Sequence, residues 1–173
     1  MKRSPFSTLL LSLAATMACN FPLFAQDDFK DVGSEAELAV RVTERVKEII
    51  GSLEERLAVQ EPIVDAFPLE EGQEEPRIMK LWMENEKAVK LLVTEPDDSG
   101  AMTRHSTFYF GGPDLFFVSQ PFSRFIFIKG KLEYWLDEDW NAIPATLELL
   151  DEREGLLYDE ANRYLSWFFG GKG

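Results

Sequence analysis

Between residues 34 and 57, apolar residues recur at steps of three and four, the spacing that places them on one face of a helix. Ser34 and Glu37 have the spacing of a capping box, which predicts a helix start there, and Pro62 predicts that the helix ends before it. We expect this stripe to pack on the domain's own sheet, and a coiled-coil or partner-binding role is the alternative. Its members are Leu38, Val42, Val46, Ile49, Ile50, Leu53 and Leu57.

Residues 61–76 interrupt the periodic pattern. Prolines and a glycine punctuate this stretch, and four glutamates lie between residues 70 and 75. Such a composition is typical of a solvated loop, so we expect a connector between the helix and the following elements.

Residues 77–139 consist of short runs of aromatic and β-branched residues, separated by polar or glycine-containing turns. Each unit of two runs and a turn predicts a β-hairpin. Because strands that are neighbours in sequence tend to pair, the series predicts an antiparallel meander of about six strands. The expected turns are Glu84–Lys87, Gly111–Asp114 and Ile128–Lys131.

Large apolar side chains fall on both faces of this predicted sheet. Side chains alternate along a strand, so Leu132, Tyr134 and Leu136 share one face and Trp135 lies on the other. Two explanations remain open at this point. Either helices of the same chain cover both faces, or one face exposes an aromatic patch to a partner.

A second helical region follows the hairpins. Pro144 suits a first helical turn, Gly155 is expected to interrupt the helix, and Gly170 is expected to end it in a left-handed conformation. The order of helix, meander and helices predicts an α+β fold, in which a long N-terminal helix and C-terminal helices pack on the antiparallel sheet.

The hairpins also carry a family resemblance. Phe-Tyr-Phe precedes a turn and Leu-Phe-Phe at residues 108–117, and Phe-x-x-Gly-Lys-Leu occupies residues 127–132. This texture resembles small exported bacterial proteins of unknown function that carry repeated Tyr-Phe-x-x-Gly-Lys-Leu hairpins. The resemblance covers residues 77–139. It implies a meander sheet and an envelope location, and it brings no catalytic residues.

The first 25 residues have the order of a secretory signal peptide. Lys2 and Arg3 precede a short apolar core, and Ala25 suits the residue before the cleavage point. A second route is lipidation of Cys19, the only cysteine, which would anchor the protein to a membrane. We therefore expect a signal peptide at 1–25, a flexible leader at 26–33, a single α+β domain at 34–173, and a periplasmic, secreted or Cys19-anchored protein without an integral membrane span.

The chain is acidic, with 31 Asp and Glu residues against 18 Lys and Arg residues and a net charge of −13. Loss of Lys2 and Arg3 with the signal leaves 16 basic residues and a net charge of −15. Such a surface repels nucleic acid and anionic lipid, and it attracts a basic protein or another cationic envelope component. Solubility of an exported protein is the simpler explanation of this charge, and it is the one we favour.

Candidate catalytic chemistry is sparse. His105 is the only histidine and has no nucleophile motif beside it, and we expect no catalytic residues, no metal and no cofactor. The carboxylate groups at 97–98 and 137–139 lack the alternating spacing of a calcium loop, so turn formation explains them.

These observations favour an exported, soluble, non-catalytic binding module that uses the sheet and adjoining loops. One alternative is an inhibitor of a basic envelope-targeting enzyme such as lysozyme, and another is a hydrolase that uses carboxylates near Asp137. The candidate binding surface is aromatic and acidic, and it consists of Trp135, Asp137, Glu138, Asp139 and Trp140.

Overall fold

The computed structural model describes residues 35–69 and 71–170. Within them the chain forms two helices and one seven-stranded antiparallel sheet. The elements, in chain order, are α1 (Glu35–Leu57), β1 (Ile63–Ala66), β2 (Ile78–Glu84), β3 (Lys87–Glu95), β4 (Arg104–Gly111), β5 (Asp114–Gln120), β6 (Ser123–Ile128), β7 (Lys131–Asp137) and α2 (Leu147–Phe169). The fold is therefore α+β, as the sequence predicts.

The sheet is a simple meander, in which each strand pairs with its neighbour in sequence. Two of its turns have positive φ at both central residues, which suits the right-handed twist of paired strands. These turns are Asn85-Glu86, with φ of 51° and 64°, and Lys129-Gly130, with φ of 54° and 79°. The three turns expected from the sequence all connect paired strands.

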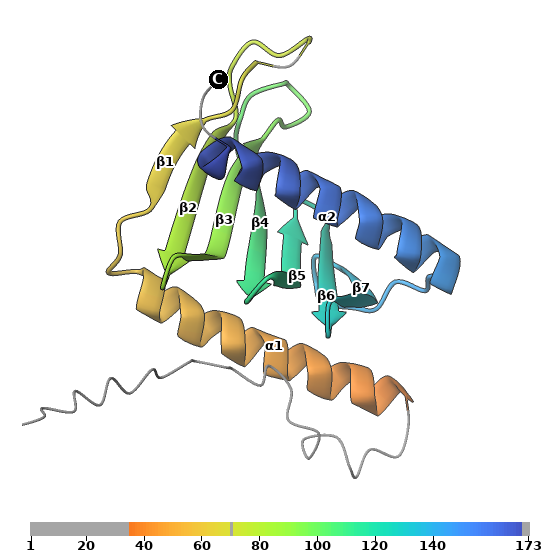
Figure 1. Cartoon of the computed structure of the whole chain (residues 1–173). Helices are drawn as coiled ribbons and strands as arrows, with labels where there is room; N and C mark the ends of the chain where they lie inside the picture. Colours follow the sequence, from red (N-terminus) through yellow and green to blue (C-terminus); the bar gives the residue numbers. More distant parts are fainter. Residues whose placement is uncertain (1–34, 70, 171–173) are drawn as a thin grey trace, which may run out of the picture.

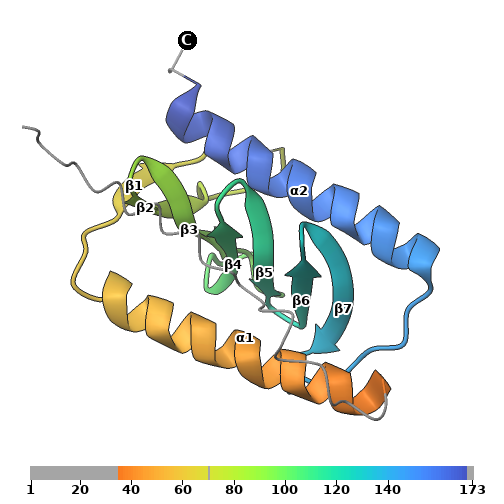
Figure 2. The ribbon, with the colours of Figure 1, turned by 60° about the horizontal axis from the view of Figure 1, so that its bottom comes forward.

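The two helices lie on opposite faces of the sheet, which makes three layers (Figures 1 and 2). We call these the α1 face and the α2 face. The α1 face buries the stripe of the first helix, including Val42 and Val46, against Tyr109, Phe117 and other residues. The α2 face buries Leu157, Ala161 and Tyr164 of the second helix against a larger apolar cluster. A helix of the same chain thus packs on each face, which is the first of the two explanations that the sequence leaves open.

The cover of the α1 face is incomplete. The helix α1 crosses the end of the sheet that holds the β2–β3, β4–β5 and β6–β7 turns (Figure 1), and the apolar cluster under it lies at that end. The strand registers define a cross-strand row on the same face beyond the helix, and its members are half-buried or exposed. The row is Lys80, Leu92, Thr107, Ser119 and Arg124.

The predicted face of one β7 residue is wrong. Leu132 packs in the α2-face cluster, whereas Tyr134 and Leu136 pack in the α1-face cluster, because the pairing of β6 with β7 shifts register between Ile126 and Phe127.

Other details also differ from the sequence predictions. The expected connector at 61–76 contains β1, so the sheet has seven strands rather than about six. The C-terminal part is one helix that continues through Gly155, because an exposed glycine costs a helix only about 1 kcal/mol and apolar packing on both sides outweighs this cost. Thr146 is the N-cap of α2, since its hydroxyl accepts a hydrogen bond from the amide of Leu149 at 3.3 Å. Pro144 therefore lies before the helix, and the prediction that it lies in the first turn is wrong.

Gly170 follows the last helical residue, but its φ of −82° is not left-handed. Its amide donates to the carbonyl of Ser166 at 2.6 Å, so the helix ends by a backbone hydrogen bond instead. The expected cap at Ser34, the signal at 1–25, Cys19 and the leader at 26–33 lie outside the described residues.

Candidate functional site

The five residues predicted as a binding surface do not form one surface. Trp135 packs on the α2 face, with its ring centroid 5.4 Å from that of Phe125 and the guanidinium carbon of Arg153 4.9 Å above it. Trp140 packs on the α1 face and stacks on Phe117, with ring centroids 5.2 Å apart. The sheet therefore separates the two tryptophans.

The acidic residues between the tryptophans form a loop that Asp137 organises. One carboxylate oxygen of Asp137 accepts hydrogen bonds from the amides of Asp139 at 2.9 Å and Asn141 at 2.8 Å. The Asn141 side chain donates to the other oxygen at 3.0 Å. These hydrogen bonds, the Asn141 side chain first, lower the pKa of Asp137. Both oxygens of Asp137 are thus used within the loop, and this geometry gives no support to a hydrolase centred on Asp137.

Glu138 and Asp139 are exposed at the tip of this loop, where Trp140 has a φ of 68°. A bulky residue rarely adopts that conformation. Here the stacking on Phe117 and two cations near the ring, Lys47 at 5.0 Å and Arg124 at 5.2 Å, hold the indole in place. The strain therefore serves the packing of Trp140 against the α1 face.

The loop at Asp97 has the same construction. Its carboxylate accepts hydrogen bonds from the hydroxyls of Ser99 and Thr103, each at 2.6 Å, and from the amide of Ser99 at 2.8 Å. These bonds, led by the Ser99 hydroxyl, hold the pKa of Asp97 well below its usual range. Turn formation thus explains this cluster, as the sequence predicts. His105 is an exposed residue of β4, opposite Thr94 of β3.

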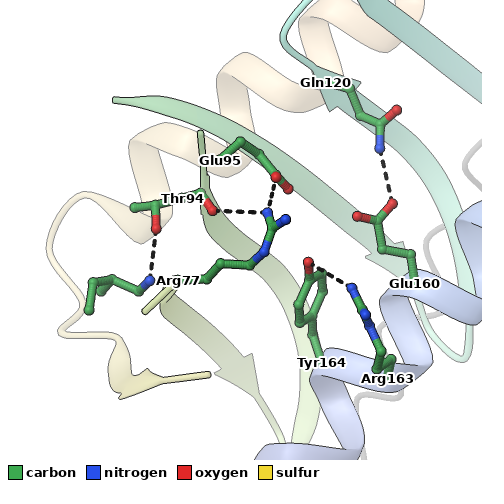
Figure 3. Close-up of polar contacts among 8 residues, drawn as sticks. Arg77, Thr94, Glu95, Gln120, Glu160, Arg163 and Tyr164 are labelled. Carbon is green, nitrogen blue, oxygen red and sulfur yellow. Dashed lines mark hydrogen bonds and ion pairs between the residues drawn. The ribbon is translucent and has the colours of Figure 1, made fainter. Parts of the chain in front are cut away.

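A half-buried polar network joins α2 to the sheet (Figure 3). The guanidinium of Arg77 pairs with the carboxylate of Glu95 across β2 and β3. On α2, Glu160 accepts a hydrogen bond from the amide nitrogen of Gln120 at 3.0 Å, and burial raises the pKa of Glu160 against the attraction of Arg163 and Arg77. Opposite charges therefore lie near one another at this end of the sheet, and the hydrogen bond between Gln120 and Glu160 connects α2 directly to the end of β5.

The next step of this network is aromatic. Arg163 donates to the hydroxyl of Tyr164 at 3.2 Å, and its guanidinium carbon lies 5.3 Å above the ring of Phe67. The rings of Phe67 and Tyr164 meet edge to face with centroids 5.2 Å apart. Phe67 directly follows β1, so the network also attaches the end of β1 to α2.

The two edges of the sheet differ. The outer side of β7 is partly closed by the chain itself, because Ala142 forms a bridge with Leu136 and the amide of Ile143 donates to the carbonyl of Trp135 at 2.8 Å. On the other side, β1 ends the strand order of the described sheet. We call the outer side of Ile63–Ala66 the β1 edge.

The register shows which groups face outward at the β1 edge. The amide of Phe67 donates to the carbonyl of Arg77 at 2.8 Å, and hydrogen-bonded pairs alternate along an antiparallel ladder. The amides and carbonyls of Val64 and Ala66 therefore point away from β2. The side chain of Asp65 accepts from the Ala66 amide at 2.9 Å, which closes the C-terminal half of the edge. The half at Ile63 and Val64 stays open, with these side chains 52% and 57% exposed.

Sequence reasoning missed this edge because prolines and glutamates dominate residues 61–76. The signal that could have found it is the β-branched pair Ile63-Val64 between Pro62 and Pro68.

Comparison of the chain with protein-family models, with curated proteins and with solved structures found no match. Neither α1 nor α2 is apolar enough along its length to cross a membrane. Within residues 35–69 and 71–170, no three His, Cys, Asp or Glu side chains gather in a way that could hold a metal ion.

Proposed function

We propose that this protein is an exported, non-catalytic binding module that takes an extended polypeptide segment along the β1 edge of its sheet. The observation that carries the proposal is the contrast between the two edges. The chain covers the Trp135–Asp137 end of the β7 edge with Ala142 and Ile143. The β1 edge instead presents outward backbone groups of Val64, and the side chains of Ile63 and Val64 beside them are exposed.

An open edge of this kind suits strand addition. In that mode the backbone hydrogen bonds of the added segment supply affinity, and its alternate side chains supply specificity. Ile63 and Val64 would give the segment apolar contacts on both faces of the sheet, because neighbouring side chains of a strand point to opposite faces. The attachment of Phe67 to Tyr164 keeps β1 fixed for this purpose.

Export rests on the N-terminal sequence, where a basic start, a short apolar core and Ala25 have the order of a signal peptide. We place the mature protein in the periplasm or outside the cell, with anchoring through a lipidated Cys19 as the alternative. Intact mass of the protein recovered from its native envelope tests this point. A chain that begins at Gln26 supports cleavage after Ala25, a diacylated chain that begins at Cys19 supports the anchor, and an unprocessed chain contradicts export.

A matched pair of variants at one position tests the edge. Val64→Pro removes the outward amide and still suits an edge strand, since that amide does not pair with β2. Val64→Thr keeps the amide and the β-branched shape. Peptides of about ten residues, selected for binding to the wild-type protein, should lose at least about tenfold in affinity for Val64→Pro and little for Val64→Thr.

Hydrogen exchange on the same complexes locates the binding. We expect the amide of Val64 to become protected when a selected peptide binds. Equal affinity of both variants, or protection confined to other strands, contradicts the proposal.

Inhibition of a basic enzyme is a second candidate, and the charge near β1 favours it. Residues 58–76 contain six acidic residues and no lysine or arginine. Complementary charge speeds the encounter of two proteins and is weakened by salt. A lysozyme assay with and without the purified protein tests this candidate, and unchanged activity at low salt contradicts it.

A further inference from the structure

The β1 edge lies among acidic residues. Glu61 lies just before the strand, Asp65 is within it, and Glu71, Glu74 and Glu75 follow in the loop to β2. All of these except the half-buried Asp65 are exposed. The arginine that follows the loop, Arg77, is paired with Glu95 of β3.

The acidic side chains have a defined position relative to the edge. Ile63 and Asp65 are opposite Leu81 and Met79 of β2, which are buried on the α2 face. Val64 is opposite Lys80, an exposed residue on the α1 face. Side chains of directly opposed residues lie on the same face of a sheet. A segment added to β1 would therefore meet Ile63 and Asp65 on the α2 face. On the α1 face it would meet Val64, with Lys80 on the next strand.

We propose, building on the proposed function above, that the segment taken at the β1 edge is a cationic extended polypeptide that alternates basic and apolar residues. Its lysine or arginine side chains lie on the α2 face beside Asp65 and toward the acidic loop, and its apolar side chains lie on the α1 face beside Val64. A basic residue on the α1 face would meet Lys80, so the alternation itself is selected.

A second copy of this chain is a poorer occupant. Two β1 edges paired with each other would bring two sets of Glu61, Asp65 and the glutamates at 71–75 together. Like charges across an interface cost several kcal/mol at low ionic strength.

The test uses three synthetic peptides of about eight residues in which valine alternates with lysine, threonine or glutamate. Binding is measured by titration calorimetry on the folded protein, at low salt and at about 0.5 M salt, where charges are screened beyond a few ångström. We expect the lysine peptide to bind at least about tenfold more tightly than the threonine peptide at low salt, the glutamate peptide to bind weakest, and high salt to remove most of these differences.

Two sets of variants separate the contribution of the acidic side chains from that of the backbone pairing at Val64. Asp65→Asn, combined with Glu71→Gln, Glu74→Gln and Glu75→Gln, keeps an acceptor for the Ala66 amide while it removes four charges, so it should reduce the preference for lysine and leave the threonine peptide unaffected. Val64→Pro should weaken the lysine and threonine peptides alike, and Val64→Thr should weaken neither.

Each outcome has one meaning. If the threonine and lysine peptides bind equally well and Val64→Pro weakens both, the edge binds peptides but the cationic preference is wrong. If no peptide binds, or if Val64→Pro leaves lysine-peptide binding intact, both the preference and the proposed function are wrong. A concentration-dependent dimer of the protein that Val64→Pro abolishes would identify a second copy as the occupant, and it would overturn the cationic segment.

Discussion

On the α2 face, apolar side chains run along most of the length of the strands, whereas on the α1 face they stop where α1 stops. The α2 face adds polar contacts at its rim, such as the Glu154 carboxylate, which accepts from the Leu132 amide at 2.7 Å. The α1 face instead buries a polar group under the helix. Lys90 is 8% exposed, its ammonium nitrogen lies 2.7 Å from the Glu54 carboxylate, and that carboxylate also accepts from Tyr109 at 2.8 Å.

This difference shows two ways in which a helix is held on a sheet. On the α2 face the fit of large side chains dominates, and polar contacts at the rim add to it. On the α1 face a narrower apolar stripe is supplemented by an ion pair between the buried Lys90 and the partly exposed Glu54, and its geometry depends on where α1 lies along the sheet. Substitutions that affect each device separately test the comparison.

The largest effect is expected at Tyr164, which is fully buried on the α2 face. Tyr164→Ala removes the ring that contacts Phe67 and Phe108, and it should lower the free energy of unfolding by about 3–5 kcal/mol in urea titrations. Leu53→Ala on α1 should fall in the lower part of the range of about 2–5 kcal/mol that such substitutions give. Leu147→Ala, on α2 but exposed, is the control and should change stability by less than about 0.5 kcal/mol. A larger loss at Leu53 than at Tyr164 would reverse the comparison.

The ion pair of the α1 face should give the next largest effect. Glu54→Ala leaves the buried ammonium of Lys90 and the hydroxyl of Tyr109 without this acceptor, and we expect a loss of about 1–3 kcal/mol in unfolding free energy. Glu54→Gln keeps an acceptor for Tyr109 and should lose less. Lys90→Met in the Glu54→Ala background should recover part of the loss, because it removes the unpaired charge. Strictly additive losses in this double-mutant cycle would show that the pair does not couple.

Alkaline pH separates the two faces through their tyrosines. Burial first, and then the neighbouring Glu54, raise the pKa of Tyr109, and burial also raises the pKa of Tyr164. Below pH 10 both tyrosines are protonated in the folded and unfolded chain. Above pH 10 the unfolded chain loses these protons while the folded chain keeps them. Stability should therefore fall as pH rises, by up to about 1.4 kcal/mol per pH unit for each tyrosine.

Two variants show how much of this loss of stability at high pH each tyrosine causes. In unfolding titrations between pH 9 and 11, the stability of Tyr109→Phe should decline less steeply with pH than that of the wild type. Tyr164→Phe should reduce the slope in the same direction by a smaller amount. An unchanged slope in Tyr109→Phe contradicts the role given to Tyr109.

The smallest expected effect is an increase in the free energy of unfolding, and it should be equal for the helices on the two faces. Gly51 of α1 and Gly155 of α2 are exposed, and nothing lies within 4 Å of a Cβ placed on either. Gly51→Ala and Gly155→Ala should each stabilise the protein by about 0.5–1 kcal/mol, because alanine loses less conformational freedom in a helix. Thermal unfolding measures this gain. Destabilisation by either substitution would show that the glycine serves a contact beyond its own helix.

The sequence predicts the hairpins well because the turn conformation depends on the residue types within the turn itself. Lys129-Gly130 needs positive φ at both positions, and glycine in the second position with short aromatic runs on either side leaves few alternatives. The stripe of α1 is equally visible, since its period is that of the helix. By contrast, Gly155 misled the prediction for α2, because the packing of Leu157, Ala161 and Tyr164 on the sheet outweighs a local helix propensity.

The candidate surface was harder to predict than the fold. Trp135 and Trp140 are close in sequence, but the face that Trp140 reaches depends on the loop that Asp137 closes and on the positive φ of Trp140. Neither can be read from spacing along a strand. The β1 edge was missed for a related reason, because four residues between prolines become a strand only through pairing with β2, which is a contact with residues about fifteen positions away.

The meander also has a consequence for how the chain acquires its structure. Each strand needs only its immediate neighbour in the chain, so every pairing closes a short loop at a small entropic cost. Sheets with such local pairing have low contact order and form faster than sheets with crossed connections. The helices differ, since each must pack across strands that have already paired. We expect the hairpins to form first, and α1 and α2 to dock afterwards on opposite faces of a sheet that has already formed.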